Sequence, residues 1–279
     1  MKYGLDVSTA GSYADPRVLA DLAAEAEDAG WDGFFVWDTV FFVPGDWPVA
    51  DPWVALAAIA MQTRRIRIGA MVTPLARRRP WQVARETVSL DHLSDGRLIF
   101  GAGLGYQAVD FAAFGEEADP KIRAEKLDEG LQVLSGLWTG ESFSFQGNHY
   151  QVNAVTFLPK PMQSPRIPVW IAGFWPNHRP FRRAARWDGT YIGTQKVNGE
   201  ILTPEELKEV VAYVKAHRGQ AEPFDVAFAG QTPSDPEEGM EIVHPYIEAG
   251  LTWWLEGIED VRGSLEEMRE RIRSGPPKM

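Results

Sequence analysis

The sequence predicts a (β/α)8 TIM barrel with a β-hairpin inserted before the fifth strand. Short strand-like runs alternate with helical patterns along the whole chain, and most of them are continuously apolar, as parallel strands buried on both faces require. A large doubly wound sheet is the alternative. The length of 279 residues favours the barrel, for which about 250 residues is typical. The eight runs cover residues 2–7, 33–38, 66–73, 97–102, 168–173, 189–193, 224–230 and 252–256.

Helix-start and helix-stop residues bound the segments between these runs. Asp15 and Pro16 form an N-cap and first-turn pair before a helix over residues 17–29, and Gly30 ends it. Pro80 suits the first turn of another helix, because the missing N–H group of proline has no intrahelical partner there. Two further amphipathic helices are predicted over residues 121–137 and 204–217.

The inserted hairpin is predicted within residues 140–168. Phe143, Phe145 and Tyr150 are among the residues that alternate with polar ones around Gly147-Asn148, a sequence typical of hairpin turns. We expect the hairpin either to roof a pocket at the barrel mouth or to pack against the barrel. Both interpretations fit the pattern equally well.

Composition indicates one cytoplasmic domain over residues 1–279. The chain starts with a strand rather than a signal peptide, and no apolar run approaches the roughly 20 residues that cross a bilayer, so no membrane partner is expected. A net charge of −11 argues against nucleic acid as a partner. The absence of cysteine excludes disulfides, thiol nucleophiles and iron–sulfur clusters, so redox chemistry would need an organic cofactor.

Motifs of several common enzyme classes are missing from the chain. The five histidines show no HExxH-type spacing, and no metal site is predicted. Neither a GxSxG elbow nor a GxxxxGK[ST] loop occurs, which argues against a serine hydrolase and a P-loop enzyme.

The barrel fold itself predicts where part of the site lies, because reactive groups in this fold lie at the carboxyl ends of the strands. Asp6 leaves the first strand and Thr194 leaves the sixth. Gly103 and Gly105 follow the fourth strand, where absent side chains let the backbone approach a flat ligand or a phosphate. We expect these four residues to contact a cofactor.

Several segments together resemble a known family. The segment RRRPWQVARETVSLDHLSDGRLIFGAGLG, residues 77–105, resembles the third helix and fourth strand of the luciferase-like monooxygenase superfamily. The similarity extends to VWD at residues 36–38, TPL at 73–75, and IAGFWP followed by RRAARWDG within 171–189. The resemblance implies a TIM barrel that uses FMN or the deazaflavin F420, and it leaves the choice between the two cofactors open.

The resemblance also implies cofactor-binding residues in two loops. Val72 and Thr73 are expected against one ring face, with a cis peptide between them, although Thr73 also reads as an ordinary strand end. The cofactor phosphate is expected after the fifth strand, where backbone N–H groups bind anions without net positive charge. The residues there are Gly173, Phe174, Trp175, Asn177 and Arg179, and a rigid exposed turn at Trp175-Pro176 is the alternative.

Three residues are candidates for catalysis, each with a structural alternative. Asp38 lies between apolar neighbours that would raise its pKa for proton transfer, or else it caps its own loop. Glu256 follows two tryptophans and has the same two interpretations. Tyr106 is expected to stack on or hydrogen-bond to a ligand, or to support its loop.

The chain departs from the family pattern beside two of these candidates. Thr39 stands where many members carry histidine, and threonine cannot relay protons as imidazole does. Tyr106 stands where some deazaflavin-dependent dehydrogenases have glutamate. For Arg77-Arg78-Arg79, an anion clamp is less expected than solvation or pairing with carboxylates for at least two of the three.

The predicted function is therefore that of an oxidoreductase acting on a small organic, apolar substrate. With reduced FMN the reaction would be oxygen-dependent monooxygenation, and a flavin reductase would be a partner. With F420 it would be hydride transfer. A homodimer is expected, because helices around such barrels often pair about a two-fold axis. A non-catalytic flavin-storage barrel and a phosphate-binding TIM-barrel lyase or isomerase remain as alternatives.

Overall fold

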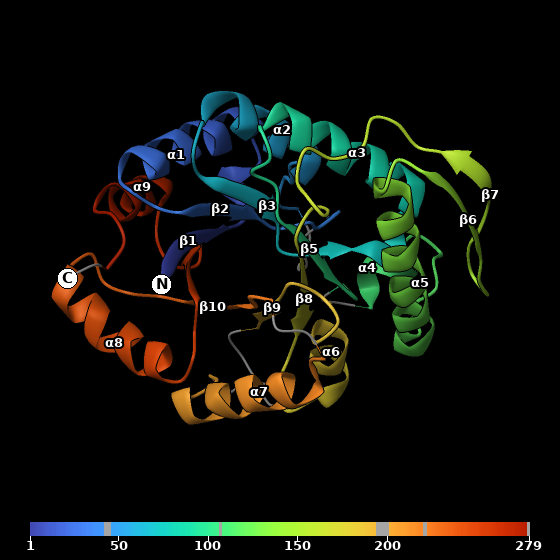
Figure 1. The fold of residues 1–279 in the computed structure, drawn as a ribbon. Helices are drawn as coiled ribbons and strands as arrows, with labels where there is room; N and C mark the ends of the chain where they lie inside the picture. Colours follow the sequence, from blue (N-terminus) through green and yellow to red (C-terminus); the bar gives the residue numbers. More distant parts are fainter. Residues whose placement is uncertain (42–45, 106–107, 194–200, 220–221, 278–279) are drawn as a thin grey trace.

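The computed structural model describes residues 1–41, 46–105, 108–193, 201–219 and 222–277, and within them the predicted barrel is present (Figure 1). Parallel strands form one nine-stranded sheet in the order β3-β2-β1-β11-β10-β9-β8-β5-β4. The strands are β1 (Lys2–Val7), β2 (Gly33–Val36), β3 (Arg67–Ala70), β4 (Thr73–Pro74), β5 (Phe100–Gly103), β8 (Val169–Gly173), β9 (Gly189–Ile192), β10 (Asp225–Gly230) and β11 (Trp253–Ile258).

The third barrel strand is divided into β3 and β4, and this division closes the barrel. Met71 and Val72 separate the two pieces, so β3 pairs with β2 while β4 pairs with β5. The backbone of Ile68 in β3 also bonds the segment before β5: it donates to the Arg97 carbonyl at 3.1 Å and accepts from the Ile99 N–H at 2.8 Å. The eight predicted strand positions thus form a closed (β/α)8 barrel.

The helices begin where the sequence supplies capping groups. An aspartate caps α1, α2, α5 and α8, and proline follows it in the first turn of each. Thr203 with Glu206, and Ser264 with Glu267, form capping boxes for α7 and α9. The helices are α1 (Pro16–Asp28), α2 (Pro52–Gln62), α3 (Pro80–Leu93), α4 (Val109–Ala112), α5 (Pro120–Trp138), α6 (His178–Ala184), α7 (Pro204–His217), α8 (Pro236–Glu248) and α9 (Leu265–Arg273), with short 3-10 turns η1 (Gly11–Tyr13) and η2 (Leu75–Arg77).

The hairpin packs against the outside of the barrel. Strands β6 (Ser142–Gln146) and β7 (Gln151–Thr156) lie at the outer edge beside α5 (Figure 1). A side chain at Gly136 of α5 would overlap the Phe143 ring, so the glycine lets the hairpin approach the helix closely. The aromatic residues of the hairpin join the core formed by the helices. The roof over the barrel mouth is therefore wrong, and the packing alternative is correct.

Alternate residues of each strand face either the helices or the barrel interior. The interior cluster consists of Phe35, Met71, Ile99, Trp170, Ala227, Ala229, Trp253 and Leu255. Small residues make room for its large rings: a Cβ on Gly33 would lie 2.6 Å from the Phe35 ring, and one on Gly189 would lie 2.4 Å from Trp170. The opposite strand faces, with residues such as Phe34, Trp254 and Ile258, pack under the helices.

None of the helices in the described part of the chain combines the length and the apolar character that spanning a membrane requires.

Candidate functional site

Asp6 is the centre of a polar cluster at the carboxyl end of the barrel strands. Its side chain is 5% exposed and lies near the end of β1, on the face opposite the outward-packed Leu5 and Val7. Asp6 accepts a hydrogen bond from the Trp37 indole N–H at 3.0 Å and one from the Tyr191 hydroxyl at 2.9 Å. Three different barrel segments therefore meet at one carboxyl group.

Burial decides the protonation behaviour of this cluster. Desolvation raises the pKa of Asp6 to about 7, although the bonds from Tyr191 and Trp37 act to lower it, and the nearby negative charge of Glu259 raises it further. Burial also holds the pKa of Tyr191 well above its usual value, and the charge of Asp6 adds to this effect. Asp6 therefore exchanges protons near neutral pH, while Tyr191 stays protonated.

The third-strand exit is apolar and packs against the same interior cluster as Tyr191. Met71 belongs to the interior cluster and Val72 packs against it. A Cβ on Gly101 or Gly103 would lie 3.3 or 2.7 Å from Val72, so glycine at both positions lets Val72 lie against β5. The non-prolyl cis peptide joins Met71 to Val72, one bond before the predicted one, at the break between β3 and β4.

Thr73 and Gly105 border this exit. Thr73 is fully buried, and its hydroxyl has no hydrogen-bond partner among the described residues. Gly105 has a positive φ of 86°, and a Cβ there would contact the Phe111 ring at 2.9 Å, which explains the glycine. The predicted site residues Tyr106 and Thr194 lie outside the described residues.

Asp38 is bound by two arginines. Its carboxylate is fully buried, and Arg77 and Arg78 each donate to it at 2.9 Å. Arg78 also donates through Nε at 3.0 Å, and Arg77 lies 3.9 Å from Asp110. Two of the three consecutive arginines therefore pair with a carboxylate, as expected from the sequence. Thr39 donates its hydroxyl hydrogen to the Phe41 carbonyl and shapes the same loop.

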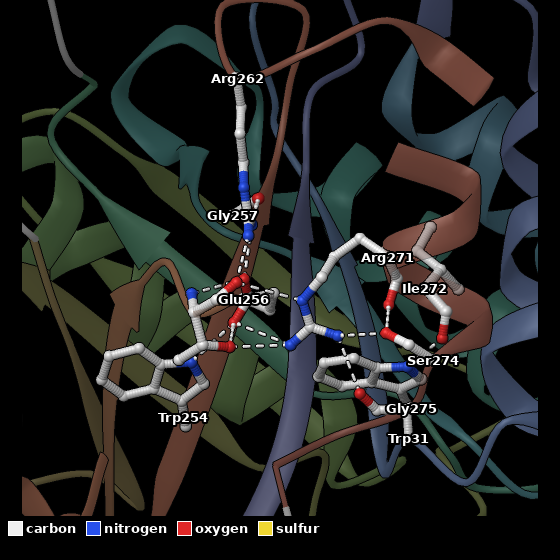
Figure 2. A network of polar contacts seen from close by, with 10 residues as sticks. Trp31, Trp254, Glu256, Gly257, Arg262, Arg271, Ile272, Ser274 and Gly275 are labelled. Carbon is white, nitrogen blue, oxygen red and sulfur yellow. Dashed lines mark hydrogen bonds and ion pairs between the residues drawn. The ribbon is translucent and has the colours of Figure 1, made fainter. Parts of the chain in front are cut away.

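Glu256 faces the helices rather than the barrel interior. It shares its strand face with Trp254 and Ile258, which pack in the outer core. Figure 2 shows the carboxylate between Arg262 and Arg271. It also accepts bonds from the Trp254 indole N–H at 3.0 Å and from the backbone and hydroxyl of Thr232.

The same network fixes the last helix to the barrel. Arg271 of α9 donates to the Gly275 carbonyl at 2.8 Å and to the Ser274 hydroxyl at 3.1 Å, and its guanidinium lies over the Trp31 ring (Figure 2). Trp31 in turn donates its indole N–H to the Ile272 carbonyl at 2.9 Å. Glu256 thus joins two arginines in a structural anchor, and the structure does not bring it to Asp6.

The loop after β8 is used largely for packing. Gly173 lets α6 approach, because a Cβ would lie 2.8 Å from Pro180. Trp175 is buried and its ring packs against His178 and Phe181. Asn177 caps α6 by accepting from the Arg179 N–H at 3.2 Å. The exposed predicted residues of this loop are Phe174, Asn177 and Arg179, and the Trp175–Pro176 peptide is cis.

No cluster of three or more potential metal-ligating side chains occurs within the described ranges. Two of the histidines have structural partners: His92 bonds the Lys160 carbonyl at 2.8 Å, and His149 pairs with Glu125 at 3.0 Å.

Tyr191 is the member of the Asp6 cluster that sequence reasoning missed, while Trp37 lies in the VWD segment that carries part of the family resemblance. A signal for Tyr191 was present. Gly189 and Tyr191 alternate along β9 with the outward-packed Ile192, so the period of two places Tyr191 inside the barrel. A tyrosine hydroxyl inside a parallel barrel needs a polar partner, and Asp6 supplies it.

Sequence comparison identifies relatives over most of the chain. The luciferase-like monooxygenase family matches residues 3–274. An F420-dependent glucose-6-phosphate dehydrogenase of Amycolatopsis mediterranei is 30% identical over 269 residues, covering 94% of this chain and 78% of that protein. The enzyme of the same name from Gordonia bronchialis is 33% identical over 91% of this chain and 75% of its own length. The match to that of Intrasporangium calvum, at 34% identity, covers 70% of this chain and 59% of that protein.

Solved structures share the fold at low sequence identity. An F420-dependent secondary alcohol dehydrogenase in complex with an F420-acetone adduct superimposes with a TM-score of 0.79 at 17% identity, over 100% of this chain and 99% of that one. The oxygenating constituent of 3,6-diketocamphane monooxygenase of Pseudomonas putida, in complex with FMN, gives 0.70 at 18% identity, over 87% and 70%. By its sequence match over residues 3–274, the chain belongs to the luciferase-like monooxygenase family and is an oxidoreductase.

Proposed function

We propose that this protein is an F420-dependent oxidoreductase that transfers two electrons and a hydrogen to or from a small, uncharged organic substrate. The observation that carries this proposal is the Asp6 cluster beside the apolar third-strand exit, at the barrel end where reactive groups lie. Support also comes from the names of the relatives in Amycolatopsis and Gordonia, which are F420-dependent dehydrogenases.

The residues at the mouth fit a flat, uncharged ring. Val72 presents an apolar side chain beside two glycines, and Thr73 holds a buried hydroxyl without a partner among the residues described. We propose that Val72, Thr73, Gly103 and Gly105 contact the ring, whereas Asp6, predicted from the sequence as a further contact, is almost fully buried and acts on the site through Tyr191. A bound deazaflavin would supply two-electron transfer, and its reduced form would react poorly with oxygen.

The polar tail of the cofactor would extend toward the loop after β8. Phe174, Asn177 and Arg179 are exposed there, and Arg179 offers a positive charge to a phosphate. The buried Gly173 and Trp175 pack the loop against α6. Tyr106 and Thr194 remain proposed contacts on the basis of the sequence.

The pairing of the charged side chains at this end of the barrel favours an uncharged substrate. Arg77 and Arg78 are both bound to Asp38, so a sugar phosphate would have to compete with a buried carboxylate for them. Phe41 and Phe114 pack edge to face, with ring centroids 5.8 Å apart, and Phe114 is 57% exposed. Their exposed surface suits an apolar group.

FMN is the second candidate cofactor, because the fold is shared with an FMN-bound monooxygenase. The test is a parallel titration of the cofactor-free protein with F420 and with FMN, followed by cofactor fluorescence and by thermal stabilisation. Selective F420 binding supports the proposal. Selective FMN binding would replace it with oxygen-dependent monooxygenation and a flavin reductase partner. Binding of neither would overturn it and favour a lyase or isomerase.

Turnover separates an enzyme from a flavin-storage barrel. An F420-bound protein that accelerates no redox reaction across a panel of alcohols and ketones would favour the storage interpretation. The contacts that hold Asp38 and Glu256 between arginines support structural roles for both, and we propose that the acid–base chemistry falls to Asp6 instead.

We further propose that α2 forms the interface of a homodimer. This helix is apolar on all sides, which is typical of a helix buried on all sides. Val54 and Met61 are each 59% exposed, and Ala57 and Ala58 lie between them at helical spacing. Antiparallel pairing about a two-fold axis would bring the acidic end at Asp51 toward the basic Arg64 of the second copy.

Light scattering of the wild type and of Met61→Glu tests the interface. We expect a dimer for the wild type and a monomer for the variant, because a carboxylate would be buried in an apolar contact. Val261→Glu, at an apolar residue that is 76% exposed and away from α2, is the matched control and should remain dimeric. A monomeric wild type, or a dimeric Met61→Glu protein, would contradict this interface.

A further inference from the structure

We propose that Asp6 and Tyr191 form a proton relay that takes up the hydroxyl proton of an alcohol during its oxidation and returns it to the carbonyl oxygen during reduction. This inference rests on the proposed function and names its substrate class and its acid–base pair. Thr39, which follows Asp38 after β2, cannot serve as the base, because a threonine hydroxyl does not titrate near neutral pH, and its hydroxyl donates to the Phe41 carbonyl at 2.9 Å.

Asp6 differs from the other buried carboxylates near this end of the barrel. Asp38 and Glu256 each contact two guanidinium groups. Asp110 lies 3.9 Å from Arg77. Across the residues that the structure describes, Asp6 alone among these four has no ion-pair partner. A buried carboxyl without a cation is held only by neutral donors, so gaining or losing a proton breaks no salt bridge.

The two hydrogen-bond donors to Asp6 differ in whether they can also accept a hydrogen bond. The Trp37 indole N–H only donates, whereas the Tyr191 hydroxyl both donates and accepts. Tyr191 also keeps part of its surface exposed, while Asp6 keeps almost none. A proton from a substrate can therefore reach Asp6 through Tyr191. Tyr191 is the residue that contacts the substrate, and Asp6 acts through it.

The step balances in atoms and charge. In the oxidation, the C–H hydrogen leaves the carbinol carbon with two electrons for the oxidised cofactor. The O–H bond breaks as the carbonyl forms, and its proton passes to the Tyr191 oxygen while the tyrosine proton moves to Asp6 Oδ2. Asp6 ends neutral and later releases the proton to solvent. Reduction of the carbonyl compound runs through the same positions in reverse.

Two titratable groups act on Asp6 from other elements. Tyr191 of β9 donates to it, and Glu259, which follows β11, adds a negative charge from the same end of the barrel. Burial raises the pKa of Glu259 itself, and the positive charge of Arg262 acts against that rise. Because burial is the largest influence, the carboxyl of Asp6 is expected to titrate near pH 7 in the cofactor-free protein.

The first test needs no bound cofactor. Protein labelled with ¹³C at the aspartate carboxyl carbons is titrated by NMR, and the Asp6 resonance is identified by its absence in Asp6→Asn. We expect its midpoint near pH 7, and we expect the midpoint to rise in Tyr191→Phe, because a donor to the carboxylate is lost. A midpoint near pH 4 in the wild type would overturn the relay. Asp225→Asn is the control and should leave the Asp6 resonance unchanged.

The second test follows F420 reduction at 420 nm with a panel of alcohols. Asp6→Asn should lower kcat by about 100-fold, which is at the lower end of the range for loss of an acid–base group. In the wild type, kcat for alcohol oxidation should rise with pH as Asp6 loses its proton, and this rise should be absent in Asp6→Asn. KM and F420 binding should change by less than about threefold, and Asp6→Glu should restore part of the rate. Tyr191→Phe should lower kcat by a similar factor.

The outcomes separate this relay from the proposed function. If the wild type fails to bind F420, the proposed function fails. If it binds F420 but oxidises none of the alcohols, or if Asp6→Asn keeps the wild-type kcat and pH profile, the relay is overturned while the cofactor assignment stands. Should Asp6→Asn fail to fold, Tyr191→Phe gives the same decision.

Discussion

The two ends of the barrel each contain a carboxyl group bonded to a tryptophan, and the two groups have different surroundings. At the carboxyl end of the strands, Asp6 accepts from the Trp37 indole N–H at 3.0 Å. At the amino end, Asp225 begins β10 and accepts from the Trp253 indole N–H at 3.1 Å. Burial raises the pKa of both.

A neighbouring cation distinguishes Asp225 from Asp6. The positive charge of Lys2, whose Nζ lies 4.9 Å from the centre of the Trp253 ring, lowers the pKa of Asp225 against the effect of burial. Around Asp225, Trp170 and Trp253 pack at 5.3 Å between ring centroids and fill the barrel base. Asp6 has Tyr191 in place of a cation. Charge compensation is therefore the feature of the structural carboxylate, and we propose that its absence at Asp6 marks the reactive end.

Glu256 gives the strongest test of this distinction, because two arginines compensate it. Replacing it with alanine leaves the buried Arg271 and the largely covered Arg262 without their carboxylate. We expect Glu256→Ala to lower the free energy of unfolding by about 3 to 5 kcal/mol, as for a broken buried ion pair. Urea denaturation at pH 7 measures it. A loss below about 1 kcal/mol, or a selective loss of turnover in a fully stable protein, would show that Glu256 is not mainly structural.

The pH dependence of stability tests Asp6. Its pKa is about 7 in the folded protein, against 3.8 when unfolded, so the folded state binds the proton more tightly. The stabilisation by protonated Asp6 is fully present below pH 3.8 and is lost as the pH rises through 7. Relative to Asp6→Asn, the wild type should lose roughly 2 to 3 kcal/mol between pH 5 and pH 8. Parallel stability curves for the two proteins would contradict the raised pKa.

Replacing Lys2 should give the smallest effect of these variants. Lys2→Met removes the cation that acts on Asp225 and should raise the pKa of that carboxyl further. The lost contact with Trp253 should cost about 0.5 to 1 kcal/mol at pH 7, since the lysine is exposed. Lys2→Arg keeps the charge and serves as the control. An altered titration of Asp6 in Lys2→Met would mean that the two ends are not independent.

The sequence predicted the barrel because burial and capping are local signals. Continuous apolar runs identified every barrel strand, and pairs such as Asp15 with Pro16 identified helix starts. Strand ends were less accurate. The last run was expected to end at Glu256, whereas β11 continues to Ile258, and this extension places Glu256 within a strand rather than in a loop at the mouth.

The site was less predictable because its contacts join residues distant in sequence. Asp6 was identified from its position at a strand end. Its bond to Tyr191 spans 185 residues, and no local pattern reports such a pair. The same holds for Asp38, whose partners Arg77 and Arg78 lie about 40 residues away. Which carboxylate meets a cation depends on the folded barrel, and this pairing separates the structural groups from the proposed reactive one.

The most direct test of the proposed reactive end is the electron density of F420 in crystals grown with the cofactor. The proposal predicts density for the ring at the carboxyl end of the strands, against Val72 and within reach of Tyr191. Density at the base near Asp225 and Lys2, or on the outer surface of the helices, would contradict it.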